Sequence, residues 1–365
     1  MLYQSKYQIV FAVVLVTMFC GCGCGSIEPK TQDIDVIIKS WAIYNQANSG
    51  LPSNDISALA VDNFGRVWIG TYSQGLAKLD ENKCTIYNTS NSGLPSNSIQ
   101  CIETDSNNNV WIGTSNGLAK FTGNSWTIYS TNNSALLYSV IRCLAVDNKG
   151  LLWIGNGHFT GGGLLSFDGR NWAVYTKENS TLPSNIINDI YIDKSNNKWI
   201  GTAGGLVNID KQNTITTFTK NNSGLLFGIN TVVNDIDNGV WIGANELERL
   251  DYEHYYGGLQ KFDGKNWIDF RPHPNGVYNP EAITSNRVDH IISDRFGYLL
   301  IATEAEWRYP YNLSFFKNGV WKNLSDIANG IPNNLFIRDM KIDKNGILWL
   351  ATQYGVISIN YAYNK

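Results

Sequence analysis

Short apolar runs separated by clusters of turn residues recur along this chain at regular intervals. Seven times an Asp is followed six residues later by a bulky apolar residue that opens a run such as Trp-Ile-Gly-Thr, and in six copies that residue is Trp. The Asp residues of these copies are Asp62, Asp105, Asp147, Asp193, Asp235, Asp294 and Asp343. They lie 43, 42, 46, 42, 59 and 49 residues apart, a period typical of propeller blades with four strands each.

Each repeat divides into four predicted strands. The first precedes the Asp, as in residues 56–61, and the second is the apolar run, because Asp-x-x-Gly between them favours a tight turn. The third strand opens with Gly and an apolar residue, and the fourth carries an aromatic pattern, as in Trp126-Thr-Ile-Tyr129. We therefore predict an all-β fold: a single seven-bladed β-propeller with four-stranded antiparallel blades.

The two ends of the repeat region predict how the ring closes. The seventh repeat reaches a third strand at residues 355–359 and has no fourth, whereas residues 40–44 have the fourth-strand pattern without the three strands before it. We expect this N-terminal strand to complete the last blade, which leaves no open edge between first and last blades. On this basis residues 39–365 form the propeller.

The N-terminal residues do not continue the repeat. Lys6 precedes an apolar run over residues 9–19, which is too short to span a bilayer but suits the core of an export signal. We predict a signal peptide over residues 1–22 and a linker over residues 23–38. The expected location is outside the cytoplasm, facing the periplasm or the cell surface of a bacterium.

Cys22 is the candidate lipidation site. It follows Gly21 in a segment that resembles the cleavage box of bacterial lipoproteins, where a small residue precedes the lipidated Cys. Cys20 and Cys24 are competing positions, and plain secretion or an uncleaved anchor are the alternatives. The lipid anchor is the only membrane contact that we expect.

Composition narrows the function classes. Charged residues make up 16% of the chain, against about 25% in an average domain, and the formal net charge is -3. There is no cluster of Lys and Arg, so nucleic acid is excluded as a partner. Outside the signal region the cysteines Cys84, Cys101 and Cys143 occupy repeat positions that suggest packing, and we expect no structural disulfide.

The aligned repeat resembles a known family. It reads Gly-Leu-Pro-Ser-Asn, then Ile-x-x-[Leu/Ile]-x-x-Asp, then Trp-Ile-Gly-Thr, and residues 50–54 and 93–97 carry the first element in full. Over residues 40–361 this pattern resembles the two-component regulator propeller repeat of extracytoplasmic bacterial sensors. The resemblance implies a binding platform, and many relatives respond to polysaccharide fragments. No kinase-like motif is present, so we expect a stand-alone lipoprotein without phosphotransfer.

Departures from the repeat indicate where function could lie. Three insertions between second and third strands cover residues 156–162, 245–256 and 304–311, and they share a face with the connections between blades. Aromatic and charged residues on exposed loops suit an oligosaccharide, another small polar ligand, or a signalling or surface protein partner. The candidate ligand-binding residues here are His158, His254, Tyr255, Tyr256, Glu306, Trp307 and Arg308.

A second set of candidates lies in the first strands. Five residues before each repeated Asp the chain has a polar residue, and we expect these seven to line the central channel: Ser57, Gln100, Arg142, Asn188, Asn230, Asp289 and Arg338. We take Arg142, Asp289 and Arg338 as ligand-binding candidates, since the two Arg side chains suit a carboxylate or sulfate. The structural alternative is a solvated channel with ion-paired charges.

The sequence thus predicts a non-catalytic, sensor-type propeller lipoprotein that binds a ligand on one face, with no catalytic residue, metal or cofactor assigned. One alternative is an enzyme, because virginiamycin-type lyases resemble seven-bladed propellers with similar Trp-Ile runs. His158, His254 and Glu306 could then supply acid and base groups, and the resemblance to the lyases implies a magnesium ion beside them. The other alternative is a pure protein-interaction scaffold.

Overall fold

The computed structural model describes most of the repeat region. The described residues are 36–81, 83–158, 161–225, 228–244, 257–270, 287–303, 312–332 and 334–363. The chain separates into two units, Met1–Asp33 and Ile34–Lys365, and every described residue belongs to the second. Among the described residues, no helix has the length and apolar character needed to cross a membrane.

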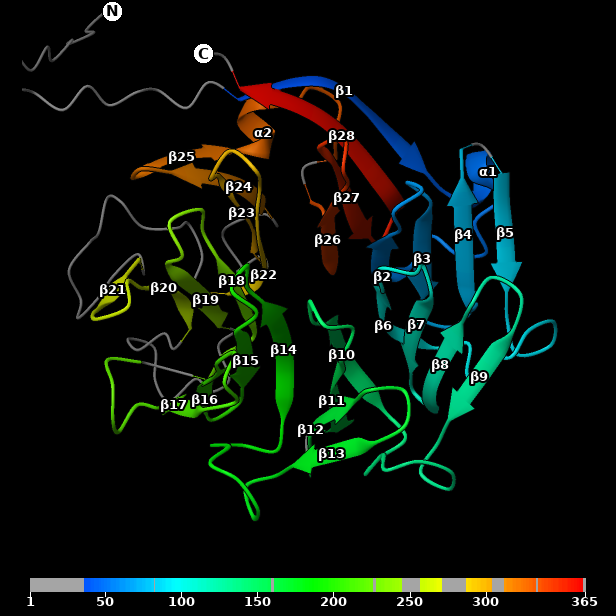
Figure 1. The fold of residues 1–365 in the computed structure, drawn as a ribbon. Coiled ribbons are helices and arrows are strands. Elements are labelled where there is room, and N and C mark those ends of the chain that lie inside the picture. Colours follow the sequence, from blue (N-terminus) through cyan, green and yellow to red (C-terminus); the bar gives the residue numbers. More distant parts are fainter. Residues whose placement is uncertain are drawn as a thin grey trace, which may run out of the picture. The chain divides into compact units, whose positions relative to one another are not determined.

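Seven four-stranded antiparallel sheets make up the second unit, in a ring (Figure 1). Blade 1 contains β2 (Ile56–Val61), β3 (Val67–Thr71), β4 (Leu76–Asp80) and β5 (Lys83–Tyr87). Blade 2 contains β6 (Ile99–Thr104), β7 (Val110–Thr114), β8 (Gly117–Phe121) and β9 (Trp126–Tyr129). Blade 3 contains β10 (Ile141–Val146), β11 (Leu152–His158), β12 (Gly161–Phe167) and β13 (Trp172–Tyr175).

The remaining blades follow the same plan. Blade 4 contains β14 (Ile187–Ile192), β15 (Lys198–Thr202), β16 (Gly205–Ile209) and β17 (Ile215–Phe218). Blade 5 contains β18 (Thr231–Asn234), β19 (Val240–Ala244), β20 (Gly258–Phe262) and β21 (Trp267–Asp269). Blade 6 contains β22 (Val288–Ser293), β23 (Leu299–Thr303), β24 (Asn312–Lys317) and β25 (Val320–Asn323). Blade 7 contains β26 (Asp339–Ile342), β27 (Ile347–Thr352), β28 (Gly355–Tyr363) and β1 (Val36–Tyr44). Two single-turn helices, α1 (Gln46–Ser49) and α2 (Leu324–Ile327), lie in connections.

The spacing of six between Asp and Trp has a direct structural cause. Asp62 Oδ1 accepts hydrogen bonds from the backbone N–H groups of Phe64 at 3.0 Å and Arg66 at 3.1 Å, which fixes the turn between β2 and β3. Its other oxygen accepts from the indole Nε1 of Trp68 at 3.0 Å. The Asp therefore orients the Trp ring while it caps the turn.

The same bond joins Asp and Trp in four further blades. The indole nitrogens of Trp111, Trp199, Trp241 and Trp349 donate to the Asp six residues before them, at 3.4, 3.2, 2.8 and 3.3 Å. These rings are buried between neighbouring sheets. Trp68, for example, stacks on Tyr87 of its own blade and meets Phe121 of the next blade edge-on. The recurrent aromatic residues thus pack blade against blade.

The N-terminal strand closes the ring, as the sequence predicts. β1 pairs antiparallel with β28, from Tyr44 opposite Val356 to Val36 opposite Tyr363. Figure 1 shows these two strands, blue and red, side by side. The pairing is longer than expected, because β28 continues to Tyr363. β1 accordingly begins at Val36, inside the segment predicted as a linker.

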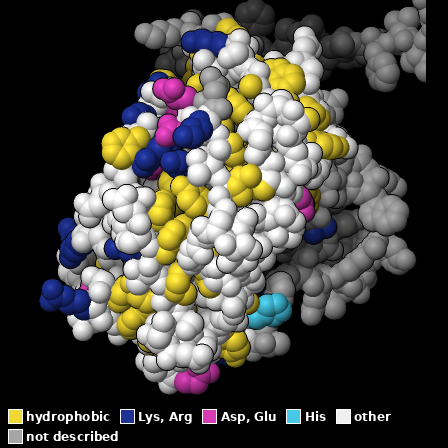
Figure 2. Space-filling model, turned by 90° about the vertical axis from the view of Figure 1, so that its right-hand side faces the viewer, with side chains coloured by type: hydrophobic (Ala, Val, Ile, Leu, Met, Phe, Trp, Pro, Cys, Tyr) yellow, Lys and Arg dark blue, Asp and Glu magenta, His cyan; other side chains and the backbone are white. Residues whose placement is uncertain are grey.

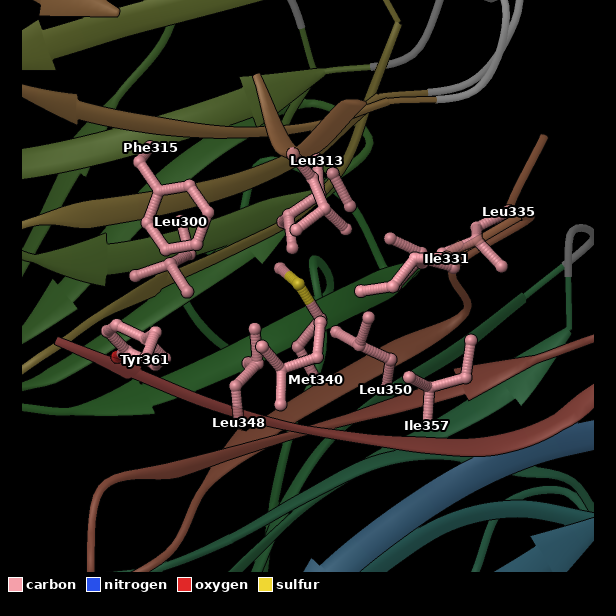
Figure 3. Close-up of a cluster of buried hydrophobic side chains, with 14 of the residues drawn as sticks. Leu300, Leu313, Phe315, Ile331, Leu335, Met340, Leu348, Leu350, Ile357 and Tyr361 are labelled. Atoms are coloured by element: carbon pink, nitrogen blue, oxygen red, sulfur yellow. The ribbon is translucent and has the colours of Figure 1, made fainter. Parts of the chain in front are cut away.

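Blades 6 and 7 share a continuous apolar core at this closure. Figure 3 shows Leu300 and Phe315 of blade 6 in one cluster with Met340, Leu348 and Ile357 of blade 7. Each large side chain of this kind contributes about 1.5–3 kcal/mol when it is fully buried. The apolar side chains buried between the last two blades therefore stabilise the closure of the ring.

The ring has two distinct faces, which we name by their connections. On the loop face, the turns between second and third strands bond to the connections between blades, as in Tyr72 N to Asp55 O at 3.4 Å and Ser115 N to Ser98 O at 3.1 Å. The turns between first and second strands and between third and fourth strands lie on the other side, the hairpin face. The described residues of the first insertion, 156–158 and 161–162, lie on the loop face with the blade connections, as expected from the sequence, whereas the insertions at residues 245–256 and 304–311 lie outside the described residues.

Candidate functional site

A central channel of about 490 Å³ runs between the first strands of the seven blades. Figure 1 shows these strands, from β2 to β26, nearest the middle of the ring. Six of the seven polar residues expected from the sequence line it: Ser57, Gln100, Arg142, Asn188, Asn230 and Arg338. Asp289 is not among the lining residues, although its backbone carbonyl accepts a hydrogen bond from Asn230 at 3.1 Å.

Arg338 is held firmly at the loop-face end of the channel. Its Nη1 forms an ion pair with Asp55 at 2.5 Å and donates to the carbonyl of Ile56 at 3.2 Å. Its guanidinium carbon lies 4.7 Å from the ring centre of Tyr72 and 4.7 Å from that of Phe336. Two aromatic rings and a carboxylate thus fix this side chain.

One exposed ring lies on this arginine, and a second stands in the turn between β27 and β28 of the same blade. Tyr72 is 44% exposed and Tyr354 is 37% exposed, although both are large hydrophobic residues. Tyr354 donates from its hydroxyl to Asn334 at 3.2 Å, and Gln353 next to it accepts from the backbone N–H of Phe336 at 2.9 Å. We call Asp55, Tyr72, Phe336, Arg338 and Tyr354 the mouth cluster. It offers flat apolar surfaces beside a guanidinium and a half-exposed carboxylate.

Arg142 has a different environment at the same repeat position. Its Nη2 donates to the side-chain oxygen of Asn188 in the next blade at 3.1 Å. Asn188 in turn donates to the carbonyl of Ile229 at 2.8 Å, and Asn230 donates to the carbonyl of Val288 at 3.2 Å. These bonds pass from blade to blade around the rim. Part of the polar lining therefore ties neighbouring first strands together.

Two half-buried carboxylates deeper in the channel accept hydrogen bonds from the backbone. Asp189 accepts from its neighbour Ile190 at 2.9 Å and from the N–H of Val232 in blade 5 at 2.8 Å. Asp339 does the same for Met340 at 2.8 Å and for Leu59 in blade 1 at 2.8 Å. The first strands are sheet edges with unpaired N–H groups, and these side chains satisfy some of them.

Charges of both signs meet in this deeper region. Lys341 lies 3.7 Å from Asp339, and the negative charge of Asp339 holds the pKa of Lys341 above its usual value, although partial desolvation opposes this shift. Burial raises the pKa of the Glu103 carboxyl, while the charge of Lys341 opposes this shift. Burial also raises the pKa of Asp189, and the nearby His290 acts in the opposite direction. Positive and negative charges therefore lie side by side in the channel lining, and neither sign dominates it.

The thiols in the channel wall are protected from ionisation. Burial raises the pKa of both Cys101 and Cys143, and neither is in a disulfide. A raised pKa disfavours the reactive thiolate. Within the described ranges, no three His, Cys, Asp or Glu side chains come together as a metal site.

Most of the loop candidates lie outside the described residues. These are His254, Tyr255, Tyr256, Glu306, Trp307 and Arg308, together with the lipidation candidate Cys22. His158 is described, and it is exposed at the end of β11, opposite Gly161 of β12. The first insertion therefore lengthens a hairpin instead of forming an open loop. Since Asn156 bonds the connection before β10 through Tyr138 and Val140, this hairpin is fixed at its base.

The mouth cluster escaped sequence reasoning apart from Arg338. Tyr72 directly follows a Trp-Ile-Gly-Thr run, where blade 2 has Ser115, and this departure from the repeat is the available signal. Asp189 and Asp339 stand four residues before the repeated Asp, next to the position examined in the sequence. The hydrogen bonds of these two carboxylates could not be predicted from the strand that carries them, because the N–H groups of Val232 and Leu59 belong to the following blade.

The side of the propeller drawn in Figure 2 is largely uncharged. Lys, Arg, Asp and Glu side chains are few on it and are interspersed with hydrophobic ones. This agrees with the low charged fraction of 16%. Lys and Arg side chains lie beside Asp and Glu side chains on this side, so it has no extended surface of one charge sign.

Comparison with known families identifies the class of repeat. Residues 50–73, 93–116 and 330–354 match the model described as "Two component regulator propeller". The resemblance stated from the sequence is thereby confirmed at these repeats. The chain is a seven-bladed β-propeller, and these three segments of it are similar to the two-component regulator propeller repeat. No curated protein matches it significantly.

Solved structures support the same fold. The extracellular domain of a putative hybrid two-component system from B. thetaiotaomicron is 22% identical with a TM-score of 0.67, and the match covers 88% of this chain and 41% of that one. This chain thus spans less than half of that structure. Virginiamycin B lyase from Staphylococcus aureus is 14% identical with a TM-score of 0.62, covering 88% and 99%. A surface component of the type-IX secretion system of Porphyromonas gingivalis is 18% identical with a TM-score of 0.61, covering 84% and 46%.

Proposed function

We propose that this chain is an extracytoplasmic, non-catalytic binding protein that is lipid-anchored through Cys22 and recognises a polar ligand, best an oligosaccharide, on the loop face. The proposal rests on the mouth cluster. Arg338 is clamped between Tyr72 and Phe336 and paired with Asp55, so a charged group and two rings are held in fixed relative positions. Such preorganisation reduces the entropy lost when a ligand binds.

The chemistry of the cluster suits a sugar. An exposed tyrosine ring offers a flat apolar surface that can cover the apolar face of a pyranose. Asp55 keeps about half of its side chain exposed and can accept hydrogen bonds from hydroxyl groups. Fold likeness adds support, because a similar propeller occurs in the extracellular domain of a putative two-component system.

A thermal-shift screen tests the proposal directly. Purified protein is heated with neutral and acidic oligosaccharides, and a ligand that binds the folded state raises the melting temperature in a concentration-dependent manner. Tyr72→Ala should weaken binding of the hit about tenfold, which corresponds to the loss of one stacking contact. Phe64→Ala, which removes an exposed ring from the hairpin face, is the matched control and should bind as the wild type does.

Two outcomes would contradict the binding site. If no glycan shifts the melting temperature, the scaffold alternative gains weight and a pulldown from the envelope fraction is the appropriate test. If a hit forms product and the His290→Ala variant does not, the protein is an enzyme. His290 is the relevant residue because it lines the channel beside Asp189.

The anchor is tested separately by detergent phase partitioning. The wild-type chain should enter the detergent phase, and the Cys22→Ala variant should no longer be lipidated. A mature wild-type protein found wholly in the aqueous phase would refute lipidation.

A further inference from the structure

Three exposed apolar side chains mark one part of the hairpin face. Phe64, Ile236 and Phe296 stand in the turns between the first and second strands of blades 1, 5 and 6, and are 68%, 49% and 48% exposed. The equivalent turns of blades 3 and 4 carry Lys149 and Ser195 where blades 1 and 6 have Phe. The turn geometry therefore does not require an apolar residue, and exposed apolar groups gathered in one region indicate an interaction surface.

Contacts join the turns of four consecutive blades. Ile236 lies against Gly297 of blade 6, where an added Cβ would come within 2.9 Å of it. Arg295 reaches the turn of blade 7, where a Cβ added at Gly346 would lie 3.5 Å from its Nη2. Lys344 of that turn donates to a backbone carbonyl of the blade 1 turn at 2.8 Å. Blades 5, 6, 7 and 1 thus present one continuous surface.

Cationic groups lie over the exposed rings. The guanidinium carbon of Arg66 is 4.7 Å from the ring centre of Phe64, and that of Arg295 is 4.8 Å from the ring centre of Phe296. An aromatic ring with a guanidinium above it combines an apolar body with a polar head. This pairing is suited to a membrane interface, where rings enter the headgroup region and cations meet phosphates.

The carboxylates of Asp62 and Asp294, in the two turns that carry Phe, are buried. Asp62 and Asp294 are buried and accept hydrogen bonds from their own turns, so their oxygens are not on the outer surface. Asp237, next to Ile236, is an exposed acidic residue of this region. The charged groups that lie on the two Phe rings are therefore guanidiniums, of which that of Arg66 also pairs with the buried Asp62 at 2.6 Å.

The propeller also begins on this face. β1 starts at Val36, which pairs with Tyr363, and the ring of Tyr363 lies 5.4 Å from that of Phe296. Cys22 is fourteen residues before Val36 in the sequence. A segment of that length spans at most about 50 Å when fully extended. A lipid on Cys22 would thus hold the propeller close to the bilayer by the side that carries Phe296.

We propose that the turns of blades 5, 6, 7 and 1 form a membrane-docking surface that rests on an anionic phospholipid bilayer. Phe64 and Phe296 enter the interface, while Arg66, Arg295 and Lys344 lie at the level of the phosphates. The tether in this inference rests on the lipid anchor proposed above, whereas the docking surface does not. Docking directs the loop face, with the mouth cluster, away from the membrane.

Hydrogen–deuterium exchange on the lipidated full chain tests the surface. The protein is compared in detergent and in vesicles of phosphatidylethanolamine and phosphatidylglycerol. We expect the turns at residues 62–66 and 294–298 to exchange about threefold or more slowly on vesicles, since docking excludes solvent. The turns at residues 147–151 and 193–197 of blades 3 and 4 are internal controls and should be unaffected.

Matched variants separate docking from the anchor. The double variant Phe64→Ser with Phe296→Ser should remain bound to vesicles and lose the slow exchange, whereas Tyr72→Ser with Tyr354→Ser should keep it. Equal exchange in detergent and vesicles at residues 62–66 and 294–298, or slowing at residues 72–75 on the loop face, would overturn the proposal. If the wild type is not lipidated, the anchor is refuted and docking is tested by sedimentation. Wild-type protein must then pellet with the vesicles, and the Phe double variant must not.

Discussion

Tyr363 donates a hydrogen bond to Asp294 across the boundary between the last two blades, with 2.5 Å between the hydroxyl oxygen and Oδ2. Tyr361 donates to the same oxygen at 3.3 Å. In five other blades this oxygen accepts from the Trp of its own blade, but blade 6 has Leu300 at that position. The last strand thus supplies the donors that the sixth repeat lacks.

Removing one of these donors should destabilise the propeller. Tyr363→Phe leaves the ring stacked on Tyr298 but deletes a partly buried hydrogen bond to a carboxylate. We expect a loss of about 1–2 kcal/mol in the free energy of unfolding, measured by urea denaturation. Tyr354→Phe, which alters an exposed hydroxyl on the loop face, is the control and should change stability by less than about 0.5 kcal/mol. If wild type and Tyr363→Phe are equally stable, the hydrogen bond makes no net contribution to the free energy of unfolding.

The same tyrosines predict a loss of stability in alkali. Burial raises the pKa of Tyr363 above its usual value, and the negative charge of Asp294 raises it further. A group with a raised folded pKa stabilises the fold fully below its unfolded pKa, near 10 for tyrosine, and this contribution falls as pH rises toward the folded pKa. The unfolding free energy should therefore fall above about pH 10, and it should fall less steeply in the Tyr361→Phe, Tyr363→Phe double variant. Identical pH profiles from pH 8 to pH 11 would contradict this assignment.

Trp68 and Trp153 form a matched pair of buried rings. Both are almost fully buried, but Trp68 donates to Asp62 whereas the indole nitrogen of Trp153 has no hydrogen-bond partner among the described residues. Asp147, its expected acceptor, instead forms an ion pair with Lys198 at 3.5 Å. Replacing Trp68 by Phe should therefore cost about 1 kcal/mol more than replacing Trp153 by Phe. Chemical denaturation of both variants gives the difference, and a larger loss for Trp153→Phe would reverse the argument.

The closing strand should be essential for stability. Deleting residues 36–44 removes the partner of β28 and exposes the apolar side chains of the last blade, among them Ile357 and Ile359. We expect the melting temperature to fall by about 10 °C or more, followed by circular dichroism. Deleting residues 23–33, which lie outside the propeller unit, is the control and should leave the melting temperature unchanged. An unaltered melting curve without β1 would mean that the ring does not depend on this strand.

The fold could be predicted from the sequence because the pattern that marks each blade is formed by residues close together in the chain. A short turn fixes Asp and Trp six residues apart, so the pattern repeats wherever a blade repeats and gives the number of blades directly. The closure could also be derived, since Trp41 to Tyr44 match the aromatic fourth strand that the last repeat lacks. The extension of β1 to Val36 carries no such pattern, because it depends only on how far β28 continues.

The candidate site was harder to predict because it depends on contacts between distant residues. Arg338 was recognised from its position in the first strand, but its partners Asp55 and Tyr72 are more than 260 residues away and belong to blade 1. The substitution of Trp by Leu300 was visible, yet its compensation by Tyr361 and Tyr363 requires the three-dimensional neighbourhood of two blades. A repeat pattern therefore identifies unusual positions without naming what they meet.

The pairing of β1 with β28 makes the order of synthesis relevant to folding. Blades 1 to 6 are formed by strands that are consecutive in the chain, so each can fold soon after its own residues are made. Blade 7 joins residue 36 to residue 363, so β1 has no partner until β28 has been made. β1 is therefore made before the strands of blades 1 to 6 and pairs only after them. A chain truncated before β28 would leave the edges of β1 and β27 unpaired and prone to aggregation.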